Sequence, residues 1–387
     1  IRHNSATSDA ITTAADGTCT AKLTSVAGGQ LSNRNIFVNG ACLISQRGTS
    51  ETGLAANGYA TVDRFRADQS GTDNYIEQHQ VDVASGTPAF QDGFRKAFQI
   101  KNGNQTSGAG TSDRVLIMYR MESQDLANSG WNYTSSSSYI TFSFYVKSSV
   151  AQNFYVNFKT SDGTSQGYVM ETGSLSANTW TKVTKTIPGN SNLQFDNDIN
   201  QGLEIEWSLY RGTATTGSMS LNTWAAFNGS VRVPDMTSTW YTTDDATFEI
   251  TGIQLEVGDT ATTFEHRIFS DELARCQRYY QVLASTANDL IGMGYGTGGG
   301  SAYVGRPLLV EMRTTPSLDD KTSGSTRFRV NGNANSNTGD NASLDSAVSN
   351  NRILSIVFTG FSGLNNGSGV YVRKQTSSAL FGVSAEL

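Results

Sequence analysis

Charged side chains are scarce in this chain, since Asp, Glu, Lys and Arg make up 16% of its 387 residues, against about 25% in typical globular domains. The net charge of -6 provides no cationic field for duplex nucleic acid or for an anionic membrane surface. No stretch approaches the roughly 18 consecutive apolar residues of a membrane-spanning helix. We therefore expect neither nucleic acid nor membrane insertion among the partners of this protein.

Cysteine and histidine are rarer still, with three of each. The cysteines are Cys19, Cys42 and Cys276. They are too few and too scattered for a disulfide framework or a zinc site, so we expect free thiols. No Gly-x-Ser-x-Gly motif accompanies the histidines, which argues against a Ser-His-Asp hydrolase. His266, between Glu265 and Arg267, is interpreted as a structural residue.

Glycine, with 39 residues, and abundant Ser, Thr and Asn are typical of strands and turns rather than of helices. The apolar residues of 202–210 alternate with polar ones, which is the period of a strand with one buried face. On the same reasoning, Trp180 and Trp207 are core residues. The clearest strands are predicted at residues 115–120, 139–148, 153–160, 179–187, 202–210 and 247–257.

These patterns predict an all-β chain: a jelly-roll β-sandwich followed by a second, smaller β-sandwich, with one short linking helix. The expected division is an N-terminal stalk or linker at 1–34, the jelly-roll at 35–269, and the helix with the C-terminal sandwich at 270–387. The stalk is too weakly apolar to bury a core of its own. Because Ile1 is not a starting Met and no signal sequence follows it, we expect the chain to be part of a longer or trimmed polypeptide.

The helix is predicted over 270–280, with Ser270 as its cap and with Leu273, Cys276 and Tyr280 on one face. Beyond it, a glycine-rich turn is expected at 292–300 and a polar loop at 331–351. The remaining strands are predicted at residues 278–283, 301–313, 327–330, 352–360, 369–375 and 380–387.

Six segments of the chain share a recognisable pattern. They are 32–41 (SNRNIFVNGA), 46–50 (QRGTS), 59–65 (YATVDRF), 247–258 (TFEITGIQLEVG), 261–267 (ATTFEHR) and 272–280 (ELARCQRYY). Together they resemble a family of phage fibre proteins found in marine and cyanobacterial phages. The resemblance spans residues 32–281 and implies a virion protein with a jelly-roll like that of carbohydrate-binding modules, usually a homotrimer, on the tail or capsid exterior. It brings no catalytic motif with it.

A pair of carboxylates about 5–10 Å apart would indicate a glycosidase, because these enzymes use two such groups. Glu204 and Glu206 would lie about 7 Å apart on one strand face. Since the opposite face is apolar, we expect them on the solvent face of the sandwich, as part of a concave binding surface rather than as a catalytic pair. The acids at 244–245 and 319–320 are expected in turns or loops. No catalytic residue is predicted.

Asp196, Asp198 and Asn200 resemble the start of an EF-hand loop. Gln201 stands where the loop requires Gly, and Trp207 where it requires Glu, so an EF-hand is excluded. The three remain weak candidates for a loosely held structural calcium, with a solvated loop as the alternative. No other metal or cofactor is expected.

Aromatic residues make up 10% of the chain, and several lie in polar, turn-rich surroundings. Flat rings on loops can stack against sugars, or they can hold loops onto the sandwich or a neighbouring subunit. Both alternatives stay open at this point. The candidate glycan-binding residues are Trp131, Tyr133, Trp224, Trp240 and Tyr241.

The leading hypothesis is a non-enzymatic phage virion component, a tail fibre or capsid-decorating fibre that displays a face for host-surface glycan. The alternatives are a glycan-degrading depolymerase and a purely architectural tail or capsid connector. A homotrimer is expected, because three chains could bury the weakly apolar stalk and the helix against copies of themselves. Other virion tail or capsid proteins are the further expected partners.

Overall fold

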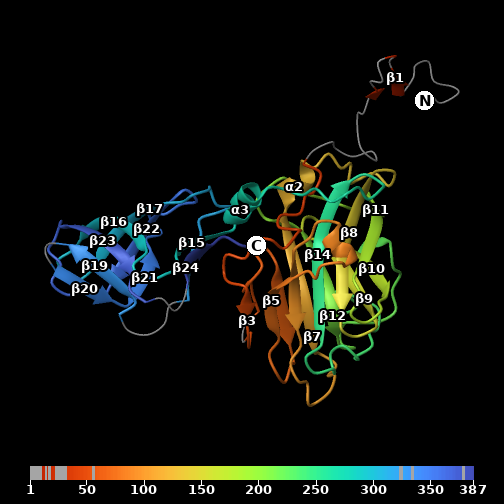
Figure 1. The fold of residues 1–387 in the computed structure, drawn as a ribbon, viewed down its shortest axis with the longest axis horizontal. Helices are drawn as coiled ribbons and strands as arrows, with labels where there is room; N and C mark the ends of the chain where they lie inside the picture. Colours follow the sequence, from red (N-terminus) through yellow and green to blue (C-terminus); the bar gives the residue numbers. More distant parts are fainter. Residues whose placement is uncertain are drawn as a thin grey trace.

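The computed structural model describes residues 11–13, 15, 19–21, 33–54, 57–321, 326–332, 335–376 and 380–387. Within them the chain is almost entirely β, which confirms the predicted fold class. Figure 1 shows a larger body of strands, a smaller one formed by the blue C-terminal strands, and α3 between them. The helices are α1 (Pro88–Gln91), α2 (Ser123–Ala127) and α3 (Phe269–Gln277).

The larger body is a sandwich of two six-stranded antiparallel sheets, named here after a central strand of each. The β12 sheet has the order β13 (Trp224–Ala226), β10 (Gln166–Ser174), β9 (Asn153–Thr160), β12 (Gln201–Arg211), β7 (Arg114–Glu122) and β4 (Arg66–Ser70). The β14 sheet has the order β11 (Thr181–Pro188), β8 (Tyr139–Ser148), β14 (Thr247–Val257), β6 (Lys96–Lys101), β5 (Glu77–Asp82) and β3 (Ser50–Glu51). All six of the strands predicted most clearly are present.

The core between these sheets is aromatic. Trp207, which points inward from β12 as the alternation predicts, packs against the rings of Phe142 and Phe144 at centroid distances of 5.9 and 5.8 Å. Trp207 and Trp180 are both buried, as expected. Burial of such large rings dominates the stability of a core, at about 3–5 kcal/mol per ring removed.

Asn35 joins the beginning of the larger sandwich to β14. Its Nδ2 donates to the carbonyl oxygen of Ile253 at 3.0 Å, while its Oδ1 accepts from the amide of Leu255 at 3.1 Å. Its own amide donates to the carboxylate of Glu265 at 2.9 Å. One buried amide side chain thus continues the hydrogen bonding of the sheet into a segment that is not itself a strand.

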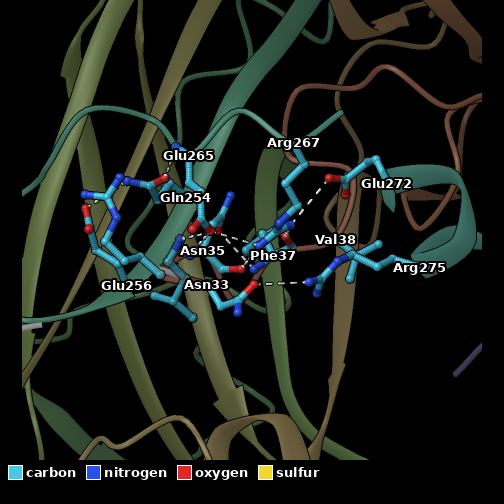
Figure 2. A network of polar contacts seen from close by, with 12 residues as sticks. Asn33, Asn35, Phe37, Val38, Gln254, Glu256, Glu265, Arg267, Glu272 and Arg275 are labelled. Carbon is cyan, nitrogen blue, oxygen red and sulfur yellow. Dashed lines mark hydrogen bonds and ion pairs between the residues drawn. The ribbon is translucent and has the colours of Figure 1, made fainter. Parts of the chain in front are cut away.

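Arg267 extends this network to α3 (Figure 2). It donates to the carbonyl oxygen of Phe37 at 2.9 Å and forms an ion pair with Glu272 of α3 at 3.4 Å. Arg275, one turn further along the helix, reaches Asn33 at 3.4 Å. Segments that carry the fibre-protein resemblance therefore meet in space, and their polar residues hold the N-terminal edge, β14 and α3 together.

The smaller body packs a seven-stranded sheet against a three-stranded one. The large sheet has the order β20 (Asn335–Gly339), β19 (Phe328–Gly332), β23 (Gly369–Lys374), β16 (Leu290–Gly296), β17 (Ala302–Pro307), β22 (Ile353–Thr359) and β21 (Asn341–Leu344). The small sheet has the order β15 (Tyr280–Ala284), β24 (Phe381–Ser384) and β18 (Ser317–Asp320). Phe328, Phe358 and Phe381 form the centre of its core.

Three sequence predictions for this body were wrong. The glycine-rich stretch at 292–300 is mostly strand β16, and the polar stretch at 331–351 contains β20 and β21. The acids at 319–320 lie in β18 rather than in a loop. In β16 glycine is required by close approach, because a Cβ on Gly294 would overlap the carbonyl oxygen of Tyr303 on β17. Glycine therefore signalled strand packing here, not a turn.

A buried ionic junction connects the two bodies. Arg64, 1% exposed, lies with its guanidinium 5.2 Å from the ring of Tyr119 and 3.4 Å from that of Tyr279. It pairs with Glu386, near the C-terminal end of the second body. Arg47 also approaches Glu386, at 3.4 Å.

Further contacts at the junction come from the residues after β24. Arg120 of β7 donates to the carbonyl oxygen of Leu387 at 2.7 Å, and the hydroxyl of Tyr59 donates to the same atom at 3.1 Å. Arg313 donates to the carbonyl oxygen of Ala385 at 2.8 Å. The smaller body is therefore held to the larger one at both of its ends, by α3 and by residues 385–387.

Asp63 is fully buried beside this junction. Burial raises its pKa to about 6, although Arg47 and hydrogen bonds from Gln46 act in the opposite direction. Glu122 behaves differently: burial disfavours its charge, but hydrogen bonds from Arg278 at 2.7 Å and Tyr279 at 2.6 Å hold its pKa below the usual value. The pKa values of Asp63 and Glu122 are thus shifted in opposite directions.

The structure corrects the predicted start and packing of the helix. Helix α3 begins at Phe269, and no side chain caps it, so Ser270 is not the cap. Cys276 and Tyr280 are buried within the same chain rather than left free for a neighbouring copy. Cys42 and Cys276 are free thiols, as expected.

Most of the predicted stalk at 1–34 lies outside the described residues. Of its described parts, β1 (Ile11–Thr13) pairs antiparallel with β2 (Cys19–Ala21) of the same chain. No helix among the described residues is long and apolar enough to cross a membrane. The boundaries at 34/35 and 269/270 stay predictions.

Candidate functional site

Three of the five candidate aromatic residues are buried, which agrees with the alternative that they hold loops onto the sandwich and not with sugar stacking. The indole nitrogen of Trp131 donates to Ser138 at 3.3 Å, and that of Trp240 donates to Thr247 at 3.1 Å, in both cases to a carbonyl oxygen. Tyr241 stacks on Tyr210 with a centroid distance of 4.4 Å. These rings hold long loops onto the sandwich, and their buried faces offer no surface for a sugar.

Tyr133 and Trp224 are half-buried. Tyr133 packs edge-on against Phe195 at 4.9 Å, and Trp224 lies 5.3 Å from the ring of Tyr168 while donating to the carbonyl oxygen of Pro188. Both have structural contacts, and a sugar-binding role for them stays a prediction.

The weak calcium candidates lie in an exposed loop. Asp196 accepts a hydrogen bond from Gln194 at 2.6 Å, and Asp198 accepts one from the amide of Asn200 at 3.0 Å. Within the described ranges, no group of three or more His, Cys, Asp or Glu residues could hold a metal ion. A loosely held structural calcium at this acidic run stays a prediction.

The prediction that Glu204 and Glu206 lie on a solvent-exposed face was wrong. Both are buried, with exposed fractions of 5% and 2%. Glu204 pairs with Arg120 at 2.9 Å, and Glu206 with Arg211 at 2.6 Å. The alternation of β12 is real, but loops and the junction cover its outer face, so its charges need internal partners. Two carboxylates engaged in this way fit a structural role.

His266, whose structural role was expected, places its Nε2 at 2.9 Å from the carbonyl oxygen of Asp92. Its ring also lies 4.9 Å from that of Phe264. These contacts join the segment after β14 to the turn that follows α1, and they confirm the interpretation.

A groove that the sequence reasoning missed lies on the outer side of the β12 sheet, at its β9–β10–β13 end. It has a volume of about 300 Å³. The floor is formed by the sheet and the walls by the loops before and after β13. The lining residues are Asn157, Gly167, Val169, Ser218, Met219, Ser220, Thr223, Ala225, Ala226, Phe227, Asn228, Val231 and Arg232.

Asn157 is the most informative residue of the groove. It is 3% exposed, and its Oδ1 is a buried acceptor without a hydrogen-bond partner among the described residues. Leaving such a group unsatisfied costs about 1–3 kcal/mol. The residue opposite Asn157 on the neighbouring strand β12 is Glu206, which already pairs with Arg211. A hydroxyl group entering the groove could donate to this oxygen.

Phe227 supplies an aromatic wall. It is half-buried, with Lys159 5.0 Å and Arg232 5.4 Å from its ring. Gly167 leaves the floor open, because a Cβ there would meet only ordinary contacts, with Phe227 at 3.6 Å and with the Oδ1 of Asn157 at 3.9 Å. The groove therefore combines a ring, an open floor, an unsatisfied acceptor and two cationic side chains near the ring.

A signal for this groove did exist in the sequence. Strand β9 places Tyr155, Asn157 and Lys159 on its outward face, and Phe227 stands directly before the Asn228-Gly229 turn. What the sequence could not indicate is that the loops around β13 fold over that face.

No family model matches the chain, and no curated protein matches it. Its structure is similar to the enzymatically active domain of tailspike protein 4 from bacteriophage CBA120, with a TM-score of 0.29 and 10% identity over 58% of this chain and 21% of that one. It is also similar to a family 11 carbohydrate-binding module from Clostridium thermocellum, with a TM-score of 0.25 and 11% identity over 56% of this chain and 99% of that one.

A third similar structure is the N-terminal cellulose-binding domain of β-1,4-glucanase C from Cellulomonas fimi, with a TM-score of 0.26 and 11% identity over 57% of this chain and 99% of that one. TM-scores this low do not identify a function, and the chain spans about a fifth of the tailspike chain. The resemblance to phage fibre proteins therefore stays a prediction from the sequence motifs.

Proposed function

We propose that this protein is a non-enzymatic, glycan-binding component of a phage virion, and that the groove beside Asn157 holds a neutral saccharide. The observation that carries the proposal is the buried, unpartnered Oδ1 of Asn157 in a groove walled by Phe227. Saccharides offer what this groove lacks, namely hydroxyl donors for the acceptor and a flat apolar ring face for the aromatic side chain.

The proposal of binding without catalysis is supported by the state of the paired carboxylates. Glu204 and Glu206 already pair with arginines, whereas a glycosidase needs two carboxyl groups free to serve as acid and as nucleophile or base. Incubation with the bound glycan should therefore release no reducing ends. Release of reducing ends would favour the depolymerase alternative.

The virion location, on the tail or capsid exterior, is proposed from the resemblance at 32–281. A purely architectural connector is the competing hypothesis. Phage that lack this protein should assemble but fail to adsorb to the host; defective assembly would instead point to the connector.

The groove can be tested by Asn157→Leu. Because the amide oxygen has no partner to lose, the substitution should leave the melting temperature unchanged or slightly raised. Affinity for the glycan selected on an array of neutral saccharides should fall about three- to tenfold. Asn192→Ala, an exposed asparagine outside the groove, serves as the matched control. Unchanged affinity in Asn157→Leu would overturn the assignment of the groove.

The homotrimer also belongs to this proposal. Light scattering of the full chain should give three times the monomer mass of 41.5 kDa. A version without residues 1–34 should lose the trimer if the stalk forms the main contact, and a monomer from the full chain would exclude trimerisation. Trimeric display would strengthen weak individual sugar contacts through avidity.

A further inference from the structure

The outward face of the seven-stranded sheet in the smaller body exposes large apolar side chains. Met293 is 66% exposed, Tyr295 50% and Tyr371 43%. They lie on the neighbouring strands β16 and β23, where Met293 faces Tyr371 across the ladder. Residues that alternate with them, such as Val370 and Val372, point into the core. A set of exposed rings on a central part of a sheet is unusual in a soluble protein.

Two of the rings are held parallel. Tyr295 faces Tyr303 of β17 across the ladder, and their centroids lie 5.4 Å apart with an interplanar angle of 6°. Gly305 and Gly369, which face Met293 and Tyr295 respectively, leave space beside the rings, since nothing lies within 4 Å of a Cβ built on either. We refer to Met293, Tyr295, Tyr303 and Tyr371 as the tyrosine platform.

Two arginines lie next to the platform on the same face. Arg329 of β19 is directly opposite Arg373 of β23, and Arg373 is two residues from Tyr371. Within the part of the chain that the structure describes, neither guanidinium has a hydrogen bond or an ion pair, and the Nε atom of each is buried without a partner. Like charges directly opposite each other destabilise a sheet.

Two other arginines of the smaller body do have acidic partners. Arg327 pairs with Asp320 at 2.8 Å, and Arg352 pairs with Glu311 at 2.7 Å. The absence of a partner is therefore a property of the Arg329–Arg373 pair and not of arginines in this body generally. In a chain of net charge -6, an uncompensated cationic pair beside exposed rings points to an anionic ligand.

We propose that the tyrosine platform and the Arg329–Arg373 pair form a second binding site, for a uronate-bearing polysaccharide. Sugar rings would lie on the tyrosines, and carboxylates would pair with the guanidinium groups, whose planar fork matches a carboxylate. The site goes beyond the proposed function, because it lies in the other body and selects a charged polymer rather than a neutral saccharide.

A polysaccharide fits this face better than a nucleic acid does. Single-stranded nucleic acids are bound by aromatic platforms that run along a continuous cationic track. Here the two unpaired cations lie together at one side of the platform and form no such track. Preferential binding of a nucleic acid would contradict the proposal.

The test uses the full chain and polygalacturonate, measured by titration calorimetry at low and moderate salt. The double variant Arg329→Gln/Arg373→Gln should fold normally, because neither side chain has a partner to lose, and should bind at least tenfold more weakly. The matched control is Lys321→Gln/Arg352→Gln, which removes the same charge from exposed side chains of the same body. Its affinity should change less than twofold.

The platform is tested by Tyr295→Leu/Tyr303→Leu, which should weaken binding about tenfold at unchanged salt dependence. If this variant unfolds, the arginine variant still decides the proposal. Absence of binding by the natural chain, an equal loss in the control, or tighter binding of dextran sulfate or of a single-stranded oligonucleotide would each overturn it.

A further arm separates this site from the groove. Asn157→Leu should bind polygalacturonate as the natural chain does, whereas the arginine variant should keep its affinity for the neutral glycan. Loss of polygalacturonate binding in Asn157→Leu would place the acidic ligand in the groove and contradict the second site. Failure of the groove assignment, by contrast, would leave the polygalacturonate result standing.

Discussion

The two bodies of this protein treat charge on the outer faces of their sheets in opposite ways. In the larger body, Glu204 and Glu206 are buried beneath loops and each is matched by an arginine. In the smaller body, Arg329 and Arg373 face each other across two strands with no acid beside them in the described chain. The paired glutamates stabilise the fold, whereas the two unpaired arginines leave positive charge that an anionic ligand can neutralise. Charge alone is therefore a poor guide to function until its partners are known.

The strongest test of this comparison is Arg211→Met. The substitution leaves Glu206 buried and without its closest partner, with Arg232 more distant at 3.9 Å. Breaking a buried pair costs about 3–5 kcal/mol, and Arg232 should keep the loss near 3 kcal/mol. Chemical denaturation should show the effect as a lower midpoint at unchanged slope. A loss below about 1 kcal/mol would show that the pair is not structural.

A second test uses the pH dependence of the junction. Because burial raises the folded-state pKa of Asp63 to about 6, the folded protein binds this proton more tightly than the unfolded chain does. The contribution of Asp63 is therefore fully present below pH 4 and is lost as the pH rises through 6, by up to about 2–3 kcal/mol.

Because the pKa of Glu122 is lowered, its contribution to stability changes with pH in the opposite direction. The contribution of Asp63 is therefore seen only when the natural chain is compared with a variant that lacks this carboxyl. The stability of Asp63→Asn should be subtracted from that of the natural chain at each pH between 4 and 7. The natural chain should gain relative to the variant as the pH falls. A flat difference would mean that Asp63 titrates normally.

The smallest effect is expected in the smaller body, at the Arg329–Arg373 pair. Arg373→Met removes one of two opposed like charges and no hydrogen bond, so we expect a stability gain of about 0.2–1 kcal/mol, measured by thermal unfolding at low salt. Added salt should shrink the gain. A clear loss of stability would indicate that the arginine has a structural partner after all.

The sequence predicted the scaffold better than the sites. Alternation along 202–210 correctly placed Trp207 in the core, because a strand has a fixed period of two. The same alternation put Glu204 and Glu206 outward, but it could not indicate that residues far along the chain cover them. Burial of an outer face depends on loops and on a neighbouring body, neither of which leaves a local pattern.

The aromatic residues illustrate the same limit. Trp131 and Trp240 have polar neighbours in the sequence, yet both are buried. Tyr295 lies between two glycines, within the stretch 292–300 that was predicted to be a turn. Close strand packing was the actual reason for those glycines. Composition alone does not separate these two uses of glycine.

The double attachment of the smaller body has a mechanical consequence. Helix α3 enters it, and residues 385–387 return to the larger body beside Arg64 and Arg120. A pulling force transmitted between the two bodies would divide between two parallel connections, so that neither has to carry the whole load. These connections lie side by side, because the amide of Ala385 donates to the carbonyl oxygen of Tyr279, just after α3, at 2.8 Å. A protein so built could stay attached to a surface under flow.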